Sequence, residues 1–126
     1  MEDIKRAKIC SDHDWITMRQ PQARWYIGTV PIADWSLEQL PKGIVYCRGQ
    51  HEKGATGYEH VQFVFNLSES STLVRAKSLL GLPTCHLEAT RSVAAVEYCW
   101  KEDTRIEGTQ FEWGTNPMVR SRVIKL

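Results

Sequence analysis

Apolar and polar residues alternate most clearly between residues 60 and 67, where the sequence reads HVQFVFNL. Side chains of a β-strand point to its two faces in turn, so this pattern predicts a strand. Three large apolar residues take the core face: Val61, Phe63 and Phe65. His60 and Gln62 then share the opposite face, roughly 6–7 Å apart from the strand rise.

Other segments rich in aromatic or β-branched residues predict further strands over 24–30, 43–48, 85–90 and 110–113. Ser36 begins a short helical turn that reaches Leu40 and ends at the following proline. A helix is expected to open within 68–71 and to end at Gly81, because apolar residues recur near a 3.6-residue period. A last helix covers 92–102, with Ser92 as its cap.

The predicted order of elements is β-α-β-β-α-β-α-β. Strand pairs joined by a turn, mixed with helices, favour an α+β fold: a central antiparallel β-sheet with flanking helices, of the ferredoxin-like or RRM-like split βαβ kind. We divide the chain into a polar N-terminal lead-in (1–23), one domain (24–116) and a C-terminal tail (117–126).

Composition narrows the class of protein only modestly. The 126 residues suffice for one domain with a real core, and 42% hydrophobic with 25% charged residues is typical of a globular protein. A formal net charge of +1 gives no overall positive field, so any nucleic acid must be bound by local patches. Four scattered cysteines without C-x-x-C spacing, and no signal peptide or apolar span, favour a reducing intracellular compartment and no membrane.

His60 and Gln62 are candidate metal ligands that leave a cation's charge uncompensated, so an acidic partner is needed. Glu52 lies across a glycine-rich loop from His60, where antiparallel neighbours would bring it alongside. Such a donor set suits Mn²⁺ or Mg²⁺. His51 and Glu59 are rival ligands. The plainer alternative is that all of these are solvated polar residues of a half-exposed sheet and its loop.

Tyr98 and Lys101 stand three residues apart on the last predicted helix, hence on one face. A phenol with a pKa near 10 is a poor nucleophile at neutral pH. To attack phosphorus, the phenol would need a metal that polarises the phosphate and a nearby cation that stabilises the phenolate. Lys101 could be that cation. An amphipathic helix with tyrosine at the core edge and lysine outside would show the same spacing.

Taken together, these motifs resemble the N-terminal nuclease domain of the replication initiator (Rep) of circular single-stranded DNA viruses, the circovirus, nanovirus and geminivirus group of HUH endonucleases. The family's second motif, His-hydrophobic-Gln, is matched at 60–62, and its third, Tyr-x-x-Lys, at 98–101. Residues 101–108 and 111–114 look most like the nanovirus form. The likeness runs from about residue 24 to 114.

The resemblance implies that His60 and Gln62 bind the metal, that Tyr98 attacks and that Lys101 assists. The position of the family's metal-binding carboxylate depends on how the sequences are aligned, and two alignments are possible. A nanovirus-like alignment of the loop selects Glu52, whereas a geminivirus-like alignment puts Gly49 there, which could bind nothing. We choose Glu52, with His51 as the alternative.

The first motif departs from the family's usual Phe-Thr-Leu-Asn-Asn, because the strand here lacks both asparagines. Arg24, Trp25 and Tyr26 offer cationic and stacking groups for single-stranded DNA. An aromatic strand facing the core explains alternate residues of this set equally well.

We therefore expect a metal-dependent, sequence-specific nicking and joining enzyme for single-stranded DNA at a rolling-circle origin, acting through a 5′-phosphotyrosine intermediate. A non-catalytic module that binds single-stranded nucleic acid on a similar fold is the alternative. The chain has no G-x-x-x-x-G-K-[ST] loop, so we expect the tail to begin a linker to a helicase domain outside this chain, on which any oligomer would depend. The resemblance also implies a host nuclear location.

Overall fold

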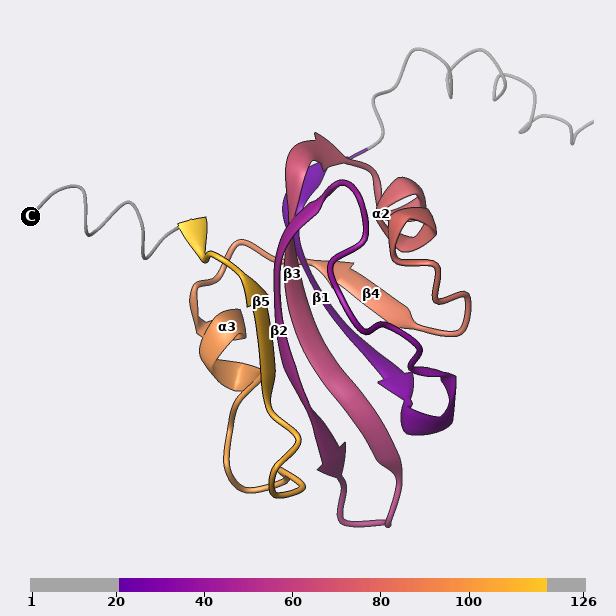
Figure 1. The fold of residues 1–126 in the computed structure, drawn as a ribbon, viewed down its shortest axis with the longest axis vertical. Coiled ribbons are helices and arrows are strands. Elements are labelled where there is room, and N and C mark those ends of the chain that lie inside the picture. The colour runs from indigo at the N-terminus through magenta and orange to yellow at the C-terminus, as the bar shows by residue number, and fades with distance from the viewer. Residues whose placement is uncertain (1–20, 118–126) are drawn as a thin grey trace, which may run out of the picture.

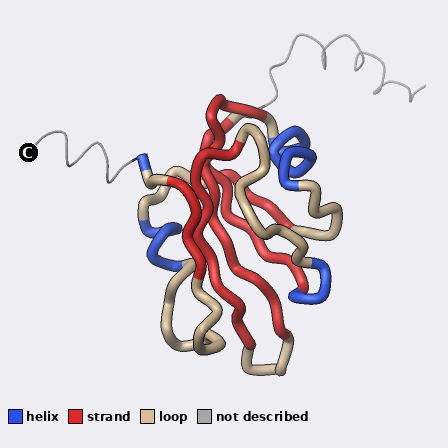
Figure 2. The backbone as a smooth tube through the Cα atoms, viewed as in Figure 1, coloured by secondary structure: helices blue, strands red, loops and turns tan. Residues whose placement is uncertain are grey.

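The computed structural model describes residues 21–117 as one five-stranded antiparallel sheet with short helices on both sides (Figures 1 and 2). The strands lie in the order β4-β1-β3-β2-β5. Their bounds are β1 Ala23–Pro31, β2 Ile44–Lys53, β3 Glu59–Ser71, β4 His86–Ala89 and β5 Phe111–Gly114. The helices are η1 Ile32–Asp34, α2 Leu73–Leu80 and α3 Ala94–Tyr98. Most of the predicted lead-in and tail fall outside the described residues.

The connections confirm the predicted α+β class. β2 and β3 form a hairpin, and β1 lies antiparallel between β3 and β4. β3 and β4 therefore run parallel on either side of β1, and α2 joins them across the sheet. This is the split βαβ arrangement. No helix within residues 21–117 has the length and apolar character needed to cross a membrane.

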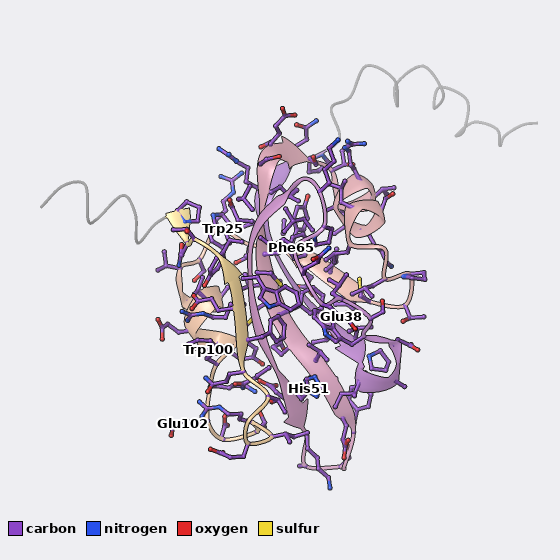
Figure 3. The ribbon with its side chains drawn as sticks, viewed as in Figure 1. Trp25, Glu38, His51, Phe65, Trp100 and Glu102 are labelled. Carbon is purple, nitrogen blue, oxygen red and sulfur yellow. The ribbon has the colours of Figure 1, made fainter. Side chains whose placement is uncertain are left out.

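The predicted core face of β3 is confirmed. Phe63 and Phe65 are fully buried in the main core, which α2 closes with Ala76 and Leu80. Trp35 packs on Phe63 at a centroid distance of 5.3 Å. We call this side of the sheet the apolar face. Figure 3 shows Phe65 near the middle of the sheet.

The opposite side of the sheet, which we call the site face, is covered as well. Val64 on β3 is fully buried against Ala95, Val96 and Cys99, from α3 and the residue after it. The plainer alternative of a half-exposed sheet thus does not hold at this point. A second, smaller apolar cluster holds α3 to the sheet.

Two predicted element boundaries are wrong for local reasons. The helical turn at 36–40 is absent, and the helix is instead η1, which follows Pro31 with its φ of −56°. The residues expected to open the next helix at 68–71 belong to β3, because Ser71 still pairs with Ala23 of β1. Thr72 caps α2 by accepting from the Arg75 backbone N–H, and Gly81 ends it as predicted, at φ +71°.

The predicted helix over 92–102 is also much too long, since α3 ends at Tyr98. The predicted cap is also displaced: the N-cap of α3 is Val93, without a side-chain cap, although the Ser92 hydroxyl before it accepts from the Ala94 N–H at 3.1 Å. Beyond Tyr98 the carbonyls of Trp100 and Lys101 accept hydrogen bonds from Arg105 and Gln50 instead of from later helical residues. Tertiary partners therefore replace the helical ladder and stop the helix there.

Candidate active site

The hairpin of β2 and β3 sets the spacing of the candidate ligands. Glu52 lies directly opposite His60, and Gln50 lies directly opposite Gln62. All four side chains leave the sheet on the site face, since each pair is two residues from the next. The structure thus places on one face the three side chains that the sequence singles out as metal ligands, Glu52, His60 and Gln62, and brings the first two into contact.

The Glu52 carboxylate is the centre of this cluster and is 1% exposed. Its Oε1 accepts from Lys101 Nζ at 2.9 Å and lies 3.2 Å from His60 Nε2. Its Oε2 accepts from Gln50 Nε2 at 2.9 Å. A buried carboxylate is costly unless it is paired and hydrogen-bonded, and here both conditions hold.

The rival ligands lie on the other side. His51 pairs with Val61 and Gly49 pairs with Phe63, both residues of the apolar face. Glu59 is exposed and precedes His60, so its side chain leaves the strand on the side opposite to the imidazole. Of the acidic and imidazole alternatives, only Glu52 lies beside His60.

Tyr98 ends α3 with its ring 49% exposed. The Lys101 ammonium lies 4.9 Å from the centre of that ring and also donates to the Thr104 hydroxyl. Lys101 therefore lies over the ring of the candidate nucleophile and pairs with the candidate metal carboxylate. The motif spacing predicts the proximity of Tyr98 and Lys101, although the latter lies beyond the helix and not on it.

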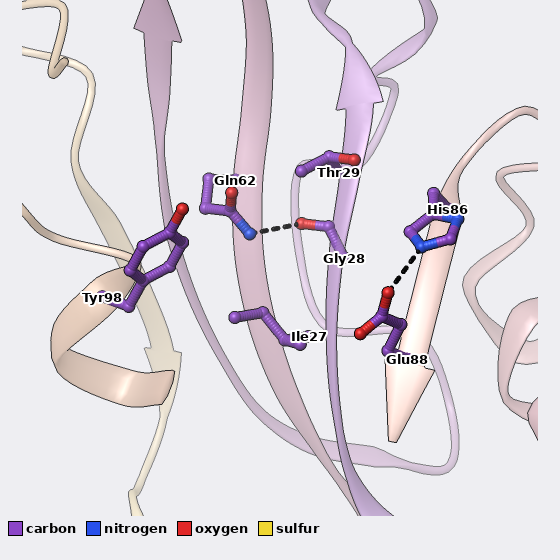
Figure 4. Close-up of a pocket in the computed structure, with 7 residues that line it drawn as sticks. All are labelled: Ile27, Gly28, Thr29, Gln62, His86, Glu88 and Tyr98. Carbon is purple, nitrogen blue, oxygen red and sulfur yellow. Dashed lines mark hydrogen bonds and ion pairs between the residues drawn. The ribbon is translucent and has the colours of Figure 1, made fainter. Parts of the chain in front are cut away.

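Tyr98 forms one wall of an open pocket of about 230 Å³ (Figure 4). Gln62 lies on the floor beside it, and its amide Nε2 donates to the Gly28 carbonyl at 3.0 Å. The opposite wall is the edge strand β4, where His86 Nε2 and Glu88 Oε2 are 3.0 Å apart. Thr29 and Ile27 complete the floor. The pocket is open and places an exposed phenol beside a polar floor.

The donor set fits a divalent cation. A carboxylate and an imidazole lie 3.2 Å apart, and the next position along β3 on the same face adds an amide oxygen. His60 Nδ1 is buried without a hydrogen-bond partner. In Figure 4 the nitrogen of the Gln62 amide faces the Gly28 carbonyl, and the amide oxygen does not. Residues 21–117 hold no group of three or more His, Cys, Asp or Glu side chains placed to bind a metal ion, so a metal here would rely on the amide as its third ligand.

Cys99 lies beneath this cluster, fully buried. Burial, with a smaller contribution from the nearby Glu52 carboxylate, raises the pKa of its thiol to about 12. The sulfur is therefore protonated at neutral pH and packs as an apolar group against Val64. It does not add an anionic ligand to the set.

Several residues of the site escape the motif patterns. Gln50 is fully buried between Glu52 and Lys101. Trp100 (Figure 3) donates its indole N–H to the Gly49 carbonyl at 3.0 Å. The Arg48 guanidinium lies 3.9 Å from the centre of the Trp100 ring. Alternation on β2 places Gln50 on the face of Glu52, so the period-two rule alone could have found it.

The three candidate DNA-binding residues of β1 lie in different environments. Arg24 is exposed at the sheet end and donates to the Ser68 carbonyl at 2.8 Å. Trp25 is half-buried on the site face against Tyr46, with ring centres 6.0 Å apart. Tyr26, however, is 1% exposed and stacks on Phe65. Its assignment as a DNA-stacking group is wrong, because its ring is part of the core.

The fold and the site define a small α+β domain with an exposed tyrosine beside a polar, cation-compatible cluster. The model of a family described as "Putative viral replication protein" matches residues 23–102, and the chain belongs to this family. That match covers every residue of the cluster and confirms the resemblance to Rep nuclease domains.

The chain is also similar to curated replication proteins of plant viruses. It is 36% identical over 86 residues to the master replication protein of milk vetch dwarf virus, covering 67% of this chain and 28% of that protein. It is 39% identical over 80 residues to the master replication protein of subterranean clover stunt virus, covering 62% and 26%. A Para-Rep of a milk vetch dwarf alphasatellite is 32% identical over 91 residues, covering 71% and 29%. The chain thus spans less than a third of the length of these relatives.

Proposed function

We propose that this domain initiates replication by nicking and rejoining single-stranded origin DNA through a covalent bond to Tyr98. One observation carries the proposal: the exposed Tyr98 lines a pocket that Gln62 also lines, and the Lys101 ammonium lies 4.9 Å from the centre of its ring. Lys101 also pairs with Glu52 Oε1, which lies 3.2 Å from His60 Nε2. The relatives named master replication proteins support the initiator role.

The covalent step balances within the substrate and one side chain. The Tyr98 oxygen attacks the scissile phosphorus, the bond from phosphorus to the 3′ oxygen breaks, and a 5′-phosphotyrosine forms. The phenol proton is lost and the leaving 3′ oxygen gains one, so a free 3′-hydroxyl results. Attack of a 3′-hydroxyl on the same phosphorus reverses the step and rejoins the strand, because the phosphotyrosine keeps the bond energy.

Each side chain then has a definite task. Lys101 stabilises the phenolate and the negative charge that develops on the phosphate, as a cation positioned next to the nucleophile does. Glu52, His60 and Gln62 would hold Mn²⁺ or Mg²⁺, which supplies Lewis-acid polarisation of the phosphate. The pocket beside Tyr98 receives the nucleotide at the cut, and the exposed Arg24 and half-buried Trp25 extend the site face toward further nucleotides.

The experiment is an adduct assay in a denaturing gel. The chain is incubated with single-stranded oligonucleotides that carry candidate origin loops, with Mn²⁺, with Mg²⁺ or with EDTA. We expect a slower-migrating covalent species with either metal and none with EDTA. Binding of the same oligonucleotides without any adduct would favour the alternative, a non-catalytic single-stranded nucleic-acid-binding module.

Residues near the site provide a matched control. Tyr58 is 52% exposed and stacks on His60 with ring centres 5.1 Å apart. Its change to phenylalanine keeps the stacked ring and removes only the hydroxyl. We expect Tyr58→Phe to form the adduct like the wild type and Tyr98→Phe to form none.

A further inference from the structure

Gln50 is a fully buried polar residue at the centre of the site face, and no motif of the sequence includes it. It lies on β2 between two functional groups. Its amide Nε2 donates to Glu52 Oε2 at 2.9 Å and to the Lys101 carbonyl at 2.7 Å. Its Oε1 accepts from Arg105 Nε at 3.1 Å. One buried amide thus makes three contacts with groups around the candidate nucleophile and the candidate metal carboxylate.

The orientation of this amide follows from the chemistry of its partners. A carboxylate and a carbonyl can only accept, whereas a guanidinium can only donate. The nitrogen of Gln50 must therefore face Glu52 and Lys101, and its oxygen must face Arg105. A flipped amide would lose all three hydrogen bonds in a buried place, where unmade bonds are costly.

Arg105 completes a hydrogen-bonded frame around Gln50, because it bonds both to the Gln50 amide and to the chain that follows α3. The half-buried guanidinium also donates through Nη2 to the Trp100 carbonyl at 2.9 Å, and the backbone of Arg105 forms an isolated bridge with Glu52. Gln50 and Arg105 together take the two carbonyls that follow Tyr98 and Cys99. The Gln50 amide therefore hydrogen-bonds both to the chain that follows α3 and to the Glu52 carboxylate.

We propose that Gln50, held by Arg105, is a positioning residue that fixes the Glu52 carboxylate and the segment 98–101 relative to each other. It touches neither the nucleophile's oxygen nor the phosphate, and it acts through Glu52 and Lys101. The catalytic meaning of this role rests on the proposed function. The structural part of the role does not depend on the proposed function, because it concerns only how two segments of the chain are joined.

The experiment compares three variants. Gln50→Met keeps a side chain of similar length and removes all three hydrogen bonds. Arg105→Met removes the guanidinium from a half-buried position and leaves the strand core intact. The control is Asn66→Leu, because Asn66 is another buried amide of the site face, 4% exposed, which donates to the Arg24 carbonyl at 3.3 Å. It lies four residues from Gln62 along β3, roughly 13 Å away from the rise of a strand.

Two readouts do not need catalysis. Hydrogen exchange reports on the amides of Trp100 and Lys101, and the paramagnetic signal of free Mn²⁺ reports metal affinity. We expect Gln50→Met to speed exchange at both amides and to weaken Mn²⁺ binding about tenfold or more, as loss of a partner behind a metal ligand does. Arg105→Met is expected to change both in the same direction by less. At saturating Mn²⁺ the adduct also forms more slowly in both variants.

The control decides whether these changes are specific. Asn66→Leu is expected to lower the thermal unfolding temperature while leaving the exchange at 100–101 and the Mn²⁺ affinity as in the wild type. The proposal is overturned if folded Gln50→Met keeps wild-type exchange and Mn²⁺ affinity, or if Asn66→Leu shows the same losses. Should Gln50→Met not fold, wild-type exchange in Arg105→Met overturns it.

Failure of the proposed function would look different. A wild-type chain that forms no adduct refutes the nicking activity, yet the exchange at 100–101 still tests how Gln50 joins the two segments. Conversely, an active wild type whose Gln50→Met variant matches it in every readout refutes only the positioning role.

Discussion

The two faces of the sheet differ in what their side chains do, although the same strands supply both. On the apolar face, Phe63 and Phe65 of β3 pack with α2 and Trp35 into the main core. On the site face, His60 and Gln62 of the same strand meet a buried carboxylate and a pocket. A shift of one residue in register would exchange the two sets. Strand alternation therefore separates the residues that stabilise the domain from those placed for chemistry.

The separation of apolar and functional residues between the two faces is incomplete at Val64. Val64 lies on the site face between Gln62 and Asn66, and with Val96 and Cys99 it fastens α3 to the sheet. The helix carrying Tyr98 is therefore held by a small apolar cluster together with the polar frame around Gln50. Apolar contacts fix where α3 lies, and hydrogen bonds fix how the chain leaves it.

The largest effect on stability is expected from the apolar face. Phe65→Ala removes a fully buried ring that stacks on Tyr26, and substitutions of this kind cost about 3–5 kcal/mol. Urea unfolding measures the loss. If the faces are as distinct as the structure indicates, the folded fraction of this variant keeps its Mn²⁺ affinity. A loss of affinity as large as in Gln50→Met would mean that the two faces are coupled.

The site face should show the reverse behaviour. Lys101→Met leaves the buried Glu52 carboxylate without its cation, so we expect a loss of about 1–3 kcal/mol in urea unfolding and a much slower adduct formation. Lys101→Arg keeps the charge and is expected to recover most of the stability. Equal adduct rates for Lys101→Met and the wild type would remove Lys101 from the proposed mechanism.

The smallest effect concerns the edge of the site face. Although partial burial acts in the opposite direction, hydrogen bonds from Tyr46 and Arg48 lower the pKa of Glu112 below its ordinary value of 4.5. A carboxyl with a lowered folded-state pKa stabilises the fold above pH 4.5. This stabilisation is lost as the pH falls from there through the folded-state pKa.

Thermal unfolding of wild type and Glu112→Gln between pH 3 and 7 measures this contribution. The advantage of the wild type is expected to be constant above pH 5 and to shrink below pH 4.5, by at most about 4 °C because the carboxylate is partly exposed. An advantage that grows on acidification would contradict the assigned sign.

The sequence predicts the sheet and the pairing of Glu52 with His60, because both follow from alternation and short spacing. His60, Gln62 and the position of Glu52 across the hairpin need only strand geometry. The early end of α3 could not be predicted, since it depends on Gln50 and Arg105, which meet the Trp100 and Lys101 carbonyls only after the sheet has formed. The burial of Tyr26 also depends on which face of β1 receives α2.

The central claim is that Tyr98 forms the covalent bond to DNA. Its most direct test is to digest the adduct formed with Mn²⁺ and to locate the attached nucleotide by mass spectrometry of the peptides. The account predicts that the nucleotide is carried by Tyr98, through its phenolic oxygen, and that Tyr98→Phe yields no modified peptide. A nucleotide found on Tyr58, or an adduct that persists in Tyr98→Phe, would contradict it.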